Sequence, residues 1–177
     1  MECGPNTIRS EIDGIKFSTP FFITGTHFLV DSKQPRVFNR YESLDSLKIG
    51  VLPSSLTERF IDQTYPNAQK IVFPGDIGRS QGVKALVNRD IDAFASDGIL
   101  LIGEVARQGL SSSQYTLSPA QPLTCDFYGM ILPKHDPQWQ RIVNSLIEGE
   151  KAKEIWGGWF TNLFPYVLLN LEYCIDK

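Results

Sequence analysis

Residues able to do chemistry are few in this chain, and they lie far apart in the sequence. His27 and His135 stand alone, without the neighbouring Cys or His residues that a metal site usually requires. The three cysteines, Cys3, Cys125 and Cys174, are too few for a disulfide framework, and one of them must stay unpaired within a monomer. The motifs G-x-x-x-x-G-K-S/T and G-x-G-x-x-G do not occur. We therefore expect no metal, no cofactor and no enzymatic activity.

Polar side chains follow two apolar runs at points where a helical pattern begins. Ser55 opens a capping-box pattern with Glu58, which predicts a helix over residues 55–63. Asp97 follows another apolar run and precedes a helical pattern over residues 99–108. In open α/β sheets, ligands bind at the carboxyl ends of the parallel strands. We therefore expect Asp97 and Ser55 to share one edge of a sheet.

Short apolar strands alternate with helices of roughly ten residues. This alternation predicts an α/β fold with a mostly parallel sheet that is covered on both faces. The expected strands cover residues 26–30, 47–52, 70–73, 91–95, 115–117 and 127–132, and expected helices cover residues 55–63, 99–108 and 137–147. Ser80 is the expected N-cap of one further helix.

Composition limits the class of protein. The 177 residues are 42% hydrophobic and 21% charged, which favours a folded core over disorder. The formal net charge is -3 and no basic cluster stands out, so a nucleic-acid partner is not expected. No run approaches the roughly 18 apolar residues of a membrane helix. The first residues also lack the basic and apolar regions of a secretory signal.

Several segments follow one another in an informative order. They are FSTPFF at residues 17–22, KIGVL at 48–52, KALVNRDIDA at 84–93, DAFASD at 92–97, FYGMI at 127–131 and WF at 159–160. This series resembles the polar amino-acid family (family 3) of periplasmic or extracellular solute-binding proteins of ABC transporters. That family typically shows F-S-x-P-Y-Y, G-V-x-x-G-S/T-S/T, A-L-x-x-G-x-V/I-D-A and V-x-D. The chain departs from the pattern at Pro53 and Ser54, where the family has a flexible glycine.

The resemblance implies a periplasmic-binding-protein-like (type II) α/β fold of two lobes joined by crossing strands. Residues 24–122 would form one complete lobe, the second. Residues 1–23 and 123–177 would be a remnant of the first lobe with the hinge strands, so the chain is expected to be truncated at its N-terminus. Most of the side-chain pocket would then lie in the missing part, and we expect the chain alone to bind its ligand weakly.

The resemblance also implies ligand contacts. Asp97 matches the aspartate that receives the ligand ammonium, with capping of the helix from Ile99 as the alternative role, and the two roles could coexist. Ser54 and Ser55 match the turn that meets the ligand carboxylate, with helix capping as the alternative role. Arg9, in a segment that starts at Asn6, resembles the arginine that clamps the carboxylate, with a solvated surface side chain as the alternative.

The function implied is binding of an amino acid or similar small polar solute for import, together with the membrane subunits of an ABC transporter, in the periplasm or outside the cell. A homodimer is expected, formed through the apolar segments 17–22, 127–132 and 156–171.

Two other functions remain open. One is a ligand-sensing domain of a receptor or sensor kinase. The other is a dehydratase-like enzyme, for which Glu104 or Asp126 would be the acid or base.

Overall fold

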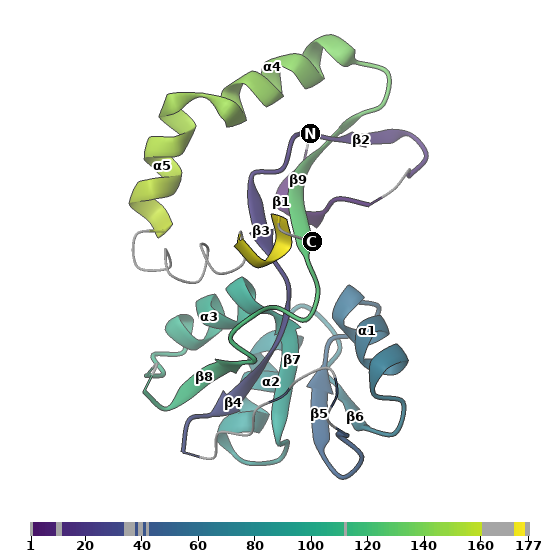
Figure 1. The fold of residues 1–177 in the computed structure, drawn as a ribbon, viewed down its shortest axis with the longest axis vertical. Coiled ribbons are helices and arrows are strands. Elements are labelled where there is room, and N and C mark those ends of the chain that lie inside the picture. Colours follow the sequence, from purple (N-terminus) through teal and green to yellow (C-terminus); the bar gives the residue numbers. More distant parts are fainter. Residues whose placement is uncertain are drawn as a thin grey trace. The chain divides into compact units, whose positions relative to one another are not determined.

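Two units, residues 1–24 with 125–177 and residues 25–124, make up the chain. The computed structural model describes residues 2–9, 12–33, 38, 41, 43–111, 113–160 and 172–175 (Figure 1). The chain therefore crosses from one unit to the other twice, after Thr24 and after Thr124.

A five-stranded mixed sheet forms the centre of residues 25–124, in the order β6-β5-β7-β4-β8. Its strands are β4 (Thr26–Asp31), β5 (Lys48–Val51), β6 (Gln69–Val72), β7 (Ala93–Asp97) and β8 (Tyr115–Ser118). Strand β5 runs parallel to β6 and β7, whereas β4 runs antiparallel to β7 and β8. The expectation of a mostly parallel sheet is therefore wrong on the β4 side. The backbone enters residues 25–124 at β4 and leaves them after β8. Because these two strands are neighbours in the sheet, they must run in opposite directions.

Helices cover both faces of this sheet, as expected. They are α1 (Leu56–Thr64), α2 (Gly78–Val87) and α3 (Gly98–Arg107). On one face Ile49 and Val51 of β5 pack with Ile61 of α1. On the other face Phe94 of β7 packs with side chains of α2 and α3, including the fully buried Leu101. Alternate residues of each strand therefore serve two cores, and burying one such side chain contributes about 2 kcal/mol.

The start of α2 differs from the prediction. Its N-cap is Ile77 and its first residue is Gly78, so the assignment of Ser80 as N-cap is wrong. A Cβ at position 78 would lie 2.2 Å from the Phe73 carbonyl oxygen. The close backbone approach therefore requires a glycine at position 78, and α2 begins there without a side-chain cap.

The other unit is built on an antiparallel sheet around β9 (Asp126–Pro133). Strand β1 (Glu2–Thr7) pairs with one side of β9. Strands β2 (Ile15–Phe17) and β3 (Phe22–Thr24) also pair with β9, opposite its second and first halves respectively.

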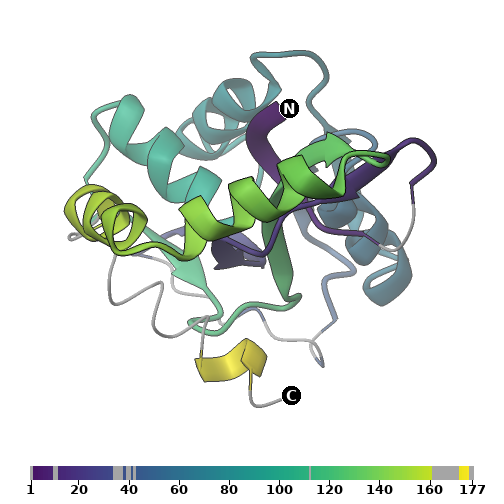
Figure 2. The same ribbon diagram turned by 90° about the horizontal axis from the view of Figure 1, so that it is seen from above.

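Helices α4 (Pro137–Glu148) and α5 (Glu150–Phe160) follow β9, and Figure 2 shows α4 across the view with α5 end-on. The strand expected at residues 127–132 and the helix expected at 137–147 are confirmed within one residue. Asn144 of α4 accepts the Thr19 N–H over 3.0 Å, and Gln140 donates to the Phe17 carbonyl oxygen over 3.0 Å.

A disulfide between Cys125 and Cys174 ties residues 172–175 to the start of β9, with the two Cα atoms 5.7 Å apart. The sequence did not decide which cysteines pair, because three cysteines allow three choices. Among the described helices, none has the length and apolar character needed to cross a membrane.

Candidate functional site

The carboxyl ends of β5 and β7 bring the predicted site residues to one edge. The two strands are parallel neighbours, with Ile49 opposite Ala93 and Gly50 opposite Phe94. Ser55 therefore follows β5 at the same edge at which Asp97 ends β7. Each residue opens a helix, so the first N–H groups of α1 and α3 lie at this edge as well.

Asp97 is half-buried and caps α3. Its Oδ1 atom accepts the Ile99 N–H over 3.2 Å. The capping role that the sequence suggested is therefore present. A carboxylate at this position also supplies the negative charge that an ammonium ligand would need.

The Ser54–Ser55 turn is already hydrogen-bonded within the chain. Ser55 Oγ accepts the Glu58 N–H over 3.0 Å and donates to the Leu52 carbonyl oxygen over 2.8 Å. The Ser55 hydroxyl hydrogen is thus engaged, and capping is its observed role. Ser54 has φ of 58°, in the left-handed region that glycine adopts most easily. Ser54 therefore holds a backbone conformation that glycine adopts more easily than serine.

Glu58 brings a carboxylate to this turn. Its Oε2 atom accepts the Ser54 N–H over 2.6 Å, and its Oε1 atom lies 3.1 Å from Lys70 Nζ. Hydrogen bonds from Lys70 to Asp62 and Glu58 raise the pKa of Lys70. An external carboxylate that approached the Ser54 N–H would therefore compete with Glu58 for the same donor.

Buried threonine hydroxyls at the same edge were missed from the sequence. Thr57 Oγ1 lies 3.2 Å from Thr26 Oγ1, and Thr124 Oγ1 donates to Thr26 Oγ1 over 3.1 Å. Thr26 begins β4 opposite Asp97 in the ladder. Threonines in strand and helix patterns carry no sequence signal of this kind, because residues 26, 57 and 124 meet only through the fold.

His27 lies beside this edge in β4 and is fully buried. Its Nδ1 atom is 3.1 Å from the Gly25 carbonyl oxygen, which can only accept, so Nδ1 carries the hydrogen. Burial lowers the pKa of His27, and hydrogen bonds to the Gly25 and Ala120 backbones oppose this effect in part. The expectation that His27 is a strand residue is confirmed. His135, by contrast, is exposed.

Arg9 and Asn6 belong to the other unit. Asn6 lies in β1, opposite Gly129 of β9. Arg9 is exposed and follows Ile8, whose N–H donates to the Phe127 carbonyl oxygen over 2.7 Å. Asp97, Ser54 and Ser55 thus lie at one edge of the sheet in residues 25–124, whereas Asn6 and Arg9 belong to the other unit.

The two residues named for an enzyme belong to different units. Glu104 is buried in α3. Burial alone would raise its pKa, but hydrogen bonds from Arg107 and Gln108 outweigh burial and hold the pKa below its usual value. Asp126 lies in β9 of the other unit, opposite Thr24. Among the described residues, no group of three or more His, Cys, Asp or Glu side chains is placed to hold a metal.

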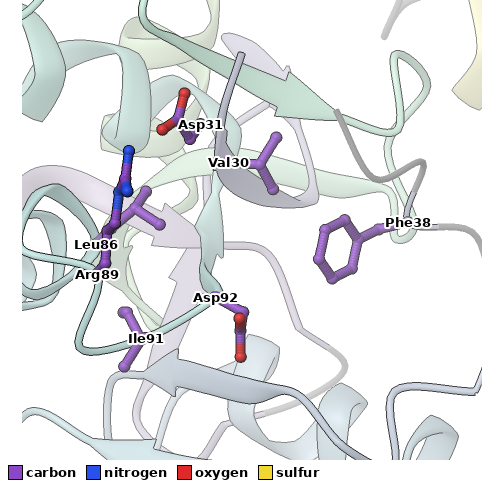
Figure 3. Close-up of a pocket in the computed structure, with 7 residues that line it drawn as sticks. All are labelled: Val30, Asp31, Phe38, Leu86, Arg89, Ile91 and Asp92. Atoms are coloured by element: carbon purple, nitrogen blue, oxygen red, sulfur yellow. The ribbon is translucent and has the colours of Figure 1, made fainter. Parts of the chain in front are cut away.

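A hollow of about 280 Å³ lies at the opposite edge of the sheet, where β4 ends and β7 begins. Its lining consists of four apolar and three charged side chains, shown in Figure 3: Val30, Phe38, Leu86, Ile91, Asp31, Arg89 and Asp92. In that view the Asp92 carboxylate extends away from Arg89 and Asp31. This hollow includes none of the predicted site residues.

Comparison with known proteins identifies relatives of this chain in sequence. No protein-family model matches the chain. The glutamate/aspartate import solute-binding protein of Escherichia coli (strain K12) is 25% identical over 182 aligned positions, which cover 98% of this chain. The chain spans 58% of the length of that protein.

Solved structures give the same result. The GluR0 ligand-binding core from Nostoc punctiforme in complex with L-glutamate has a TM-score of 0.69 at 20% identity. The aligned region covers 89% of this chain and 71% of the GluR0 chain. The ancestral amino acid-binding protein AncCDT-1, a precursor of cyclohexadienyl dehydratase, has a TM-score of 0.69 at 19% identity. The aligned region covers 89% of this chain and 66% of AncCDT-1. The fold is periplasmic-binding-protein-like. The resemblance to amino-acid solute-binding proteins is confirmed, and the fold comprises one complete α/β lobe and part of the other.

Proposed function

We propose that this chain binds an amino acid or a similar small polar solute at the edge formed by the carboxyl ends of β5 and β7. The observation that carries the proposal is the juxtaposition of Asp97 with the Ser54–Ser55 turn at that edge, in this fold. An α-amino acid needs a fixed negative charge for its ammonium and donors for its carboxylate. The two strand ends supply one of each.

Asp97 is the proposed partner of the ligand ammonium. Capping of α3 engages its Oδ1 atom and fixes the orientation of the carboxylate. A ligand hydrogen bond and the cap are compatible, because a carboxylate can accept about four hydrogen bonds. The ligand carboxylate would meet the amino end of α1, where the positive end of the helix dipole and the turn N–H groups lie.

Arg9 and Asn6 are the proposed contribution of the other unit. The planar guanidinium of Arg9 suits bidentate contact with a carboxylate. Its exposure leaves it accessible to a solute. We further propose that residues 25–124 are the second lobe of the family's fold, and that the unit around β9 is the remnant of the first lobe with the hinge strands.

The proposed setting is import through an ABC transporter in the cell envelope. Two proteins that this chain resembles in sequence are glutamate/aspartate import solute-binding proteins. The Cys125–Cys174 disulfide supports a periplasmic or extracellular location, because disulfides persist in oxidising compartments. The membrane subunits of the transporter are the proposed protein partners.

A homodimer is also proposed, through the helices that follow β9. An apolar hollow of about 230 Å³ lies within this unit, lined by Met130, Trp139, Val143, Leu146, Ile147, Ala152, Ile155 and Trp156. Leu146 and Ile155 are 66% and 50% exposed. Covering such side chains between two copies would remove apolar surface from water. Residues 161–171 of the expected interface lie outside the described residues.

A sensing domain is the second candidate, favoured by the likeness to the GluR0 ligand-binding core. It would use the same ligand edge, so the two functions differ in what the binding event controls. Binding without turnover is proposed in both cases. The ion pair of Glu104 with Arg107, 2.6 Å long, keeps that carboxylate ionised, so Glu104 is suited to accept a proton rather than to act as an acid.

The test is an amide NMR titration of the chain with L-glutamate, L-aspartate and L-arginine. NMR detects weak binding, with Kd on the order of 1 mM, which is expected if only part of the pocket is present. Saturable shifts of the amides at residues 54–58 and 97–99 support the proposal. Shifts confined to other regions, or no saturable shift with any of the three, would refute it.

A further inference from the structure

Three threonine hydroxyls form a hydrogen-bonded chain within residues 25–124. It runs from Thr57 to Thr26 over 3.2 Å and from Thr26 to Thr124 over 3.1 Å. The Thr26 N–H also donates to Thr124 Oγ1 over 2.9 Å. Thr26 and Thr57 are only 1% and 7% exposed. Water therefore competes little for these groups, and the bonds are stronger than they would be at the surface.

The threonines at the two ends of this hydrogen-bonded row lie at informative positions in the fold. Thr57 is in the first turn of α1, two residues after Ser55. Thr26 and Thr124 lie next to the two points at which the backbone leaves this unit. The threonine chain therefore connects the helix that opens at the candidate site with both crossover segments.

Helix α3 has its own connection to the same place. The Gly98 N–H, one residue after Asp97, donates to the Gly25 carbonyl oxygen over 2.9 Å. A Cβ at position 25 would lie 1.8 Å from the Thr124 carbonyl oxygen, so the two crossover segments touch backbone to backbone. Both helices of the candidate site are thus held against Gly25, Thr26 and Thr124.

We propose that Thr57 is a positioning residue for the candidate site. Its hydroxyl bond to Thr26 sets the first turn of α1 against the crossover segments, so that ligand binding at the Ser54–Ser55 turn and the conformation at Thr26 and Thr124 are linked. The inference rests on the proposed function. By linkage, a change at either end must affect the other by the same free energy.

The competing explanation is that the hydroxyls only satisfy one another. In that case an apolar residue of the same shape at position 57 would remove the hydroxyl bond between Thr57 and Thr26 but would leave ligand binding unchanged. Thr57→Val keeps the shape and removes the hydroxyl, whereas Thr57→Ser keeps the hydroxyl. Thr64→Val is the control, because Thr64 is a half-buried threonine at the other end of the same helix.

The first readout needs no ligand. Thr57→Val is expected to speed amide hydrogen exchange at Thr26 and Leu123 about fivefold, the factor that one lost hydrogen bond implies. Leu123 reports on the second crossover because its N–H donates to the Thr26 carbonyl oxygen over 2.9 Å. Thr57→Ser and Thr64→Val should leave both rates unchanged. Unchanged rates in Thr57→Val would overturn the inference, whether or not any ligand binds.

The second readout uses L-glutamate as the probe. In the unmodified chain and in Thr57→Ser, shifts at residues 54–58 should be accompanied by shifts at Thr26 and Thr124. In Thr57→Val the shifts at residues 97–99 should remain, while those at Thr26 and Thr124 shrink and affinity falls about fivefold. A full response of Thr26 and Thr124 in Thr57→Val would overturn the link. Absence of any response in the unmodified chain would instead count against the proposed function, and the exchange rates would still decide the role of Thr57.

Discussion

At the scale of single residues, Glu58 decides how available the α1 turn is to a ligand carboxylate. Its carboxylate accepts the Ser54 N–H over 2.6 Å. We predict that Glu58→Ala lowers the unfolding free energy by about 1 kcal/mol, because one capping bond is lost. We also predict that it tightens L-glutamate binding several-fold, because the donor is freed and a like charge is removed. Denaturant unfolding and NMR titration measure the two effects.

Asp62→Asn is the control for this prediction. Asp62 lies on the same helix and contacts the same lysine, with Nζ of Lys70 2.7 Å away, but it does not bond the Ser54 turn. It should leave glutamate affinity unchanged. Weaker binding in Glu58→Ala than in Asp62→Asn would show that Glu58 supports the ligand rather than competes with it.

His27 makes the stability of the chain depend on pH. Burial holds its pKa below the ordinary value near 6.5, so the unfolded chain takes up a proton more readily than the folded chain. The stability that neutral His27 contributes is therefore present above about pH 6.5 and is lost as the pH falls below it. Glu104 also has a lowered pKa, but its contribution is lost only below about pH 4.5.

Urea unfolding between about pH 7.5 and pH 5 tests this assignment. The unfolding free energy of the unmodified chain should fall across that range. His27→Gln cannot titrate and should show a smaller fall, even if it is less stable throughout. An equal fall in both proteins would assign the pH dependence to other groups.

At the scale of elements, the disulfide determines how firmly residues 172–175 are held. Closing a loop with a sequence separation of 49 reduces the entropy of the unfolded chain and stabilises the fold by about 4 kcal/mol in the chain-entropy model. We predict a loss of this order in the double variant Cys125→Ser, Cys174→Ser, measured by chemical unfolding. Cys3→Ser is the control and should change stability little. A double variant as stable as the control would show that the bridge contributes nothing.

Local patterns were enough to predict most elements of the fold. Helices α1 and α3 begin at the predicted caps, Ser55 and Asp97, because capping depends only on nearby residues. The start of α2 was missed because this helix begins at Gly78 without a side-chain cap, so no capping residue marks it. The direction of β4 was missed for a similar reason. It depends on where the chain enters and leaves the unit, which no local pattern encodes.

The candidate site was predictable in part. The edge shared by Asp97 and Ser55 follows from the rule for parallel strands. Two features were not predictable. Glu58 accepts the Ser54 N–H in a turn where Ser54 adopts a left-handed conformation, which serine rarely adopts. The threonine chain joins residues that are far apart in the sequence, and only the folded chain brings them together.

At the scale of the whole molecule, the apolar hollow beside α4 and α5 makes self-association testable. We predict that the chain forms a homodimer and that Leu146→Glu shifts it to the monomer, because a charge would be buried at the interface. Light scattering over a concentration series measures the mass. Lys134→Glu is the control, an exposed charge change in the same unit. A mass of 19.9 kDa at every concentration would rule out the dimer.

The central claim is that one edge of the sheet recognises an amino acid through Asp97, and a single comparison tests it most directly. The affinities of the unmodified chain and of Asp97→Asn are measured by NMR for L-glutamate and for glutarate, which has the two carboxylates but no ammonium. Asn caps helices about as well as Asp, so the start of α3 should be kept. The account predicts that Asp97→Asn weakens glutamate binding about tenfold or more and does not weaken glutarate binding. Equal effects on both compounds, or no effect on glutamate, would contradict it.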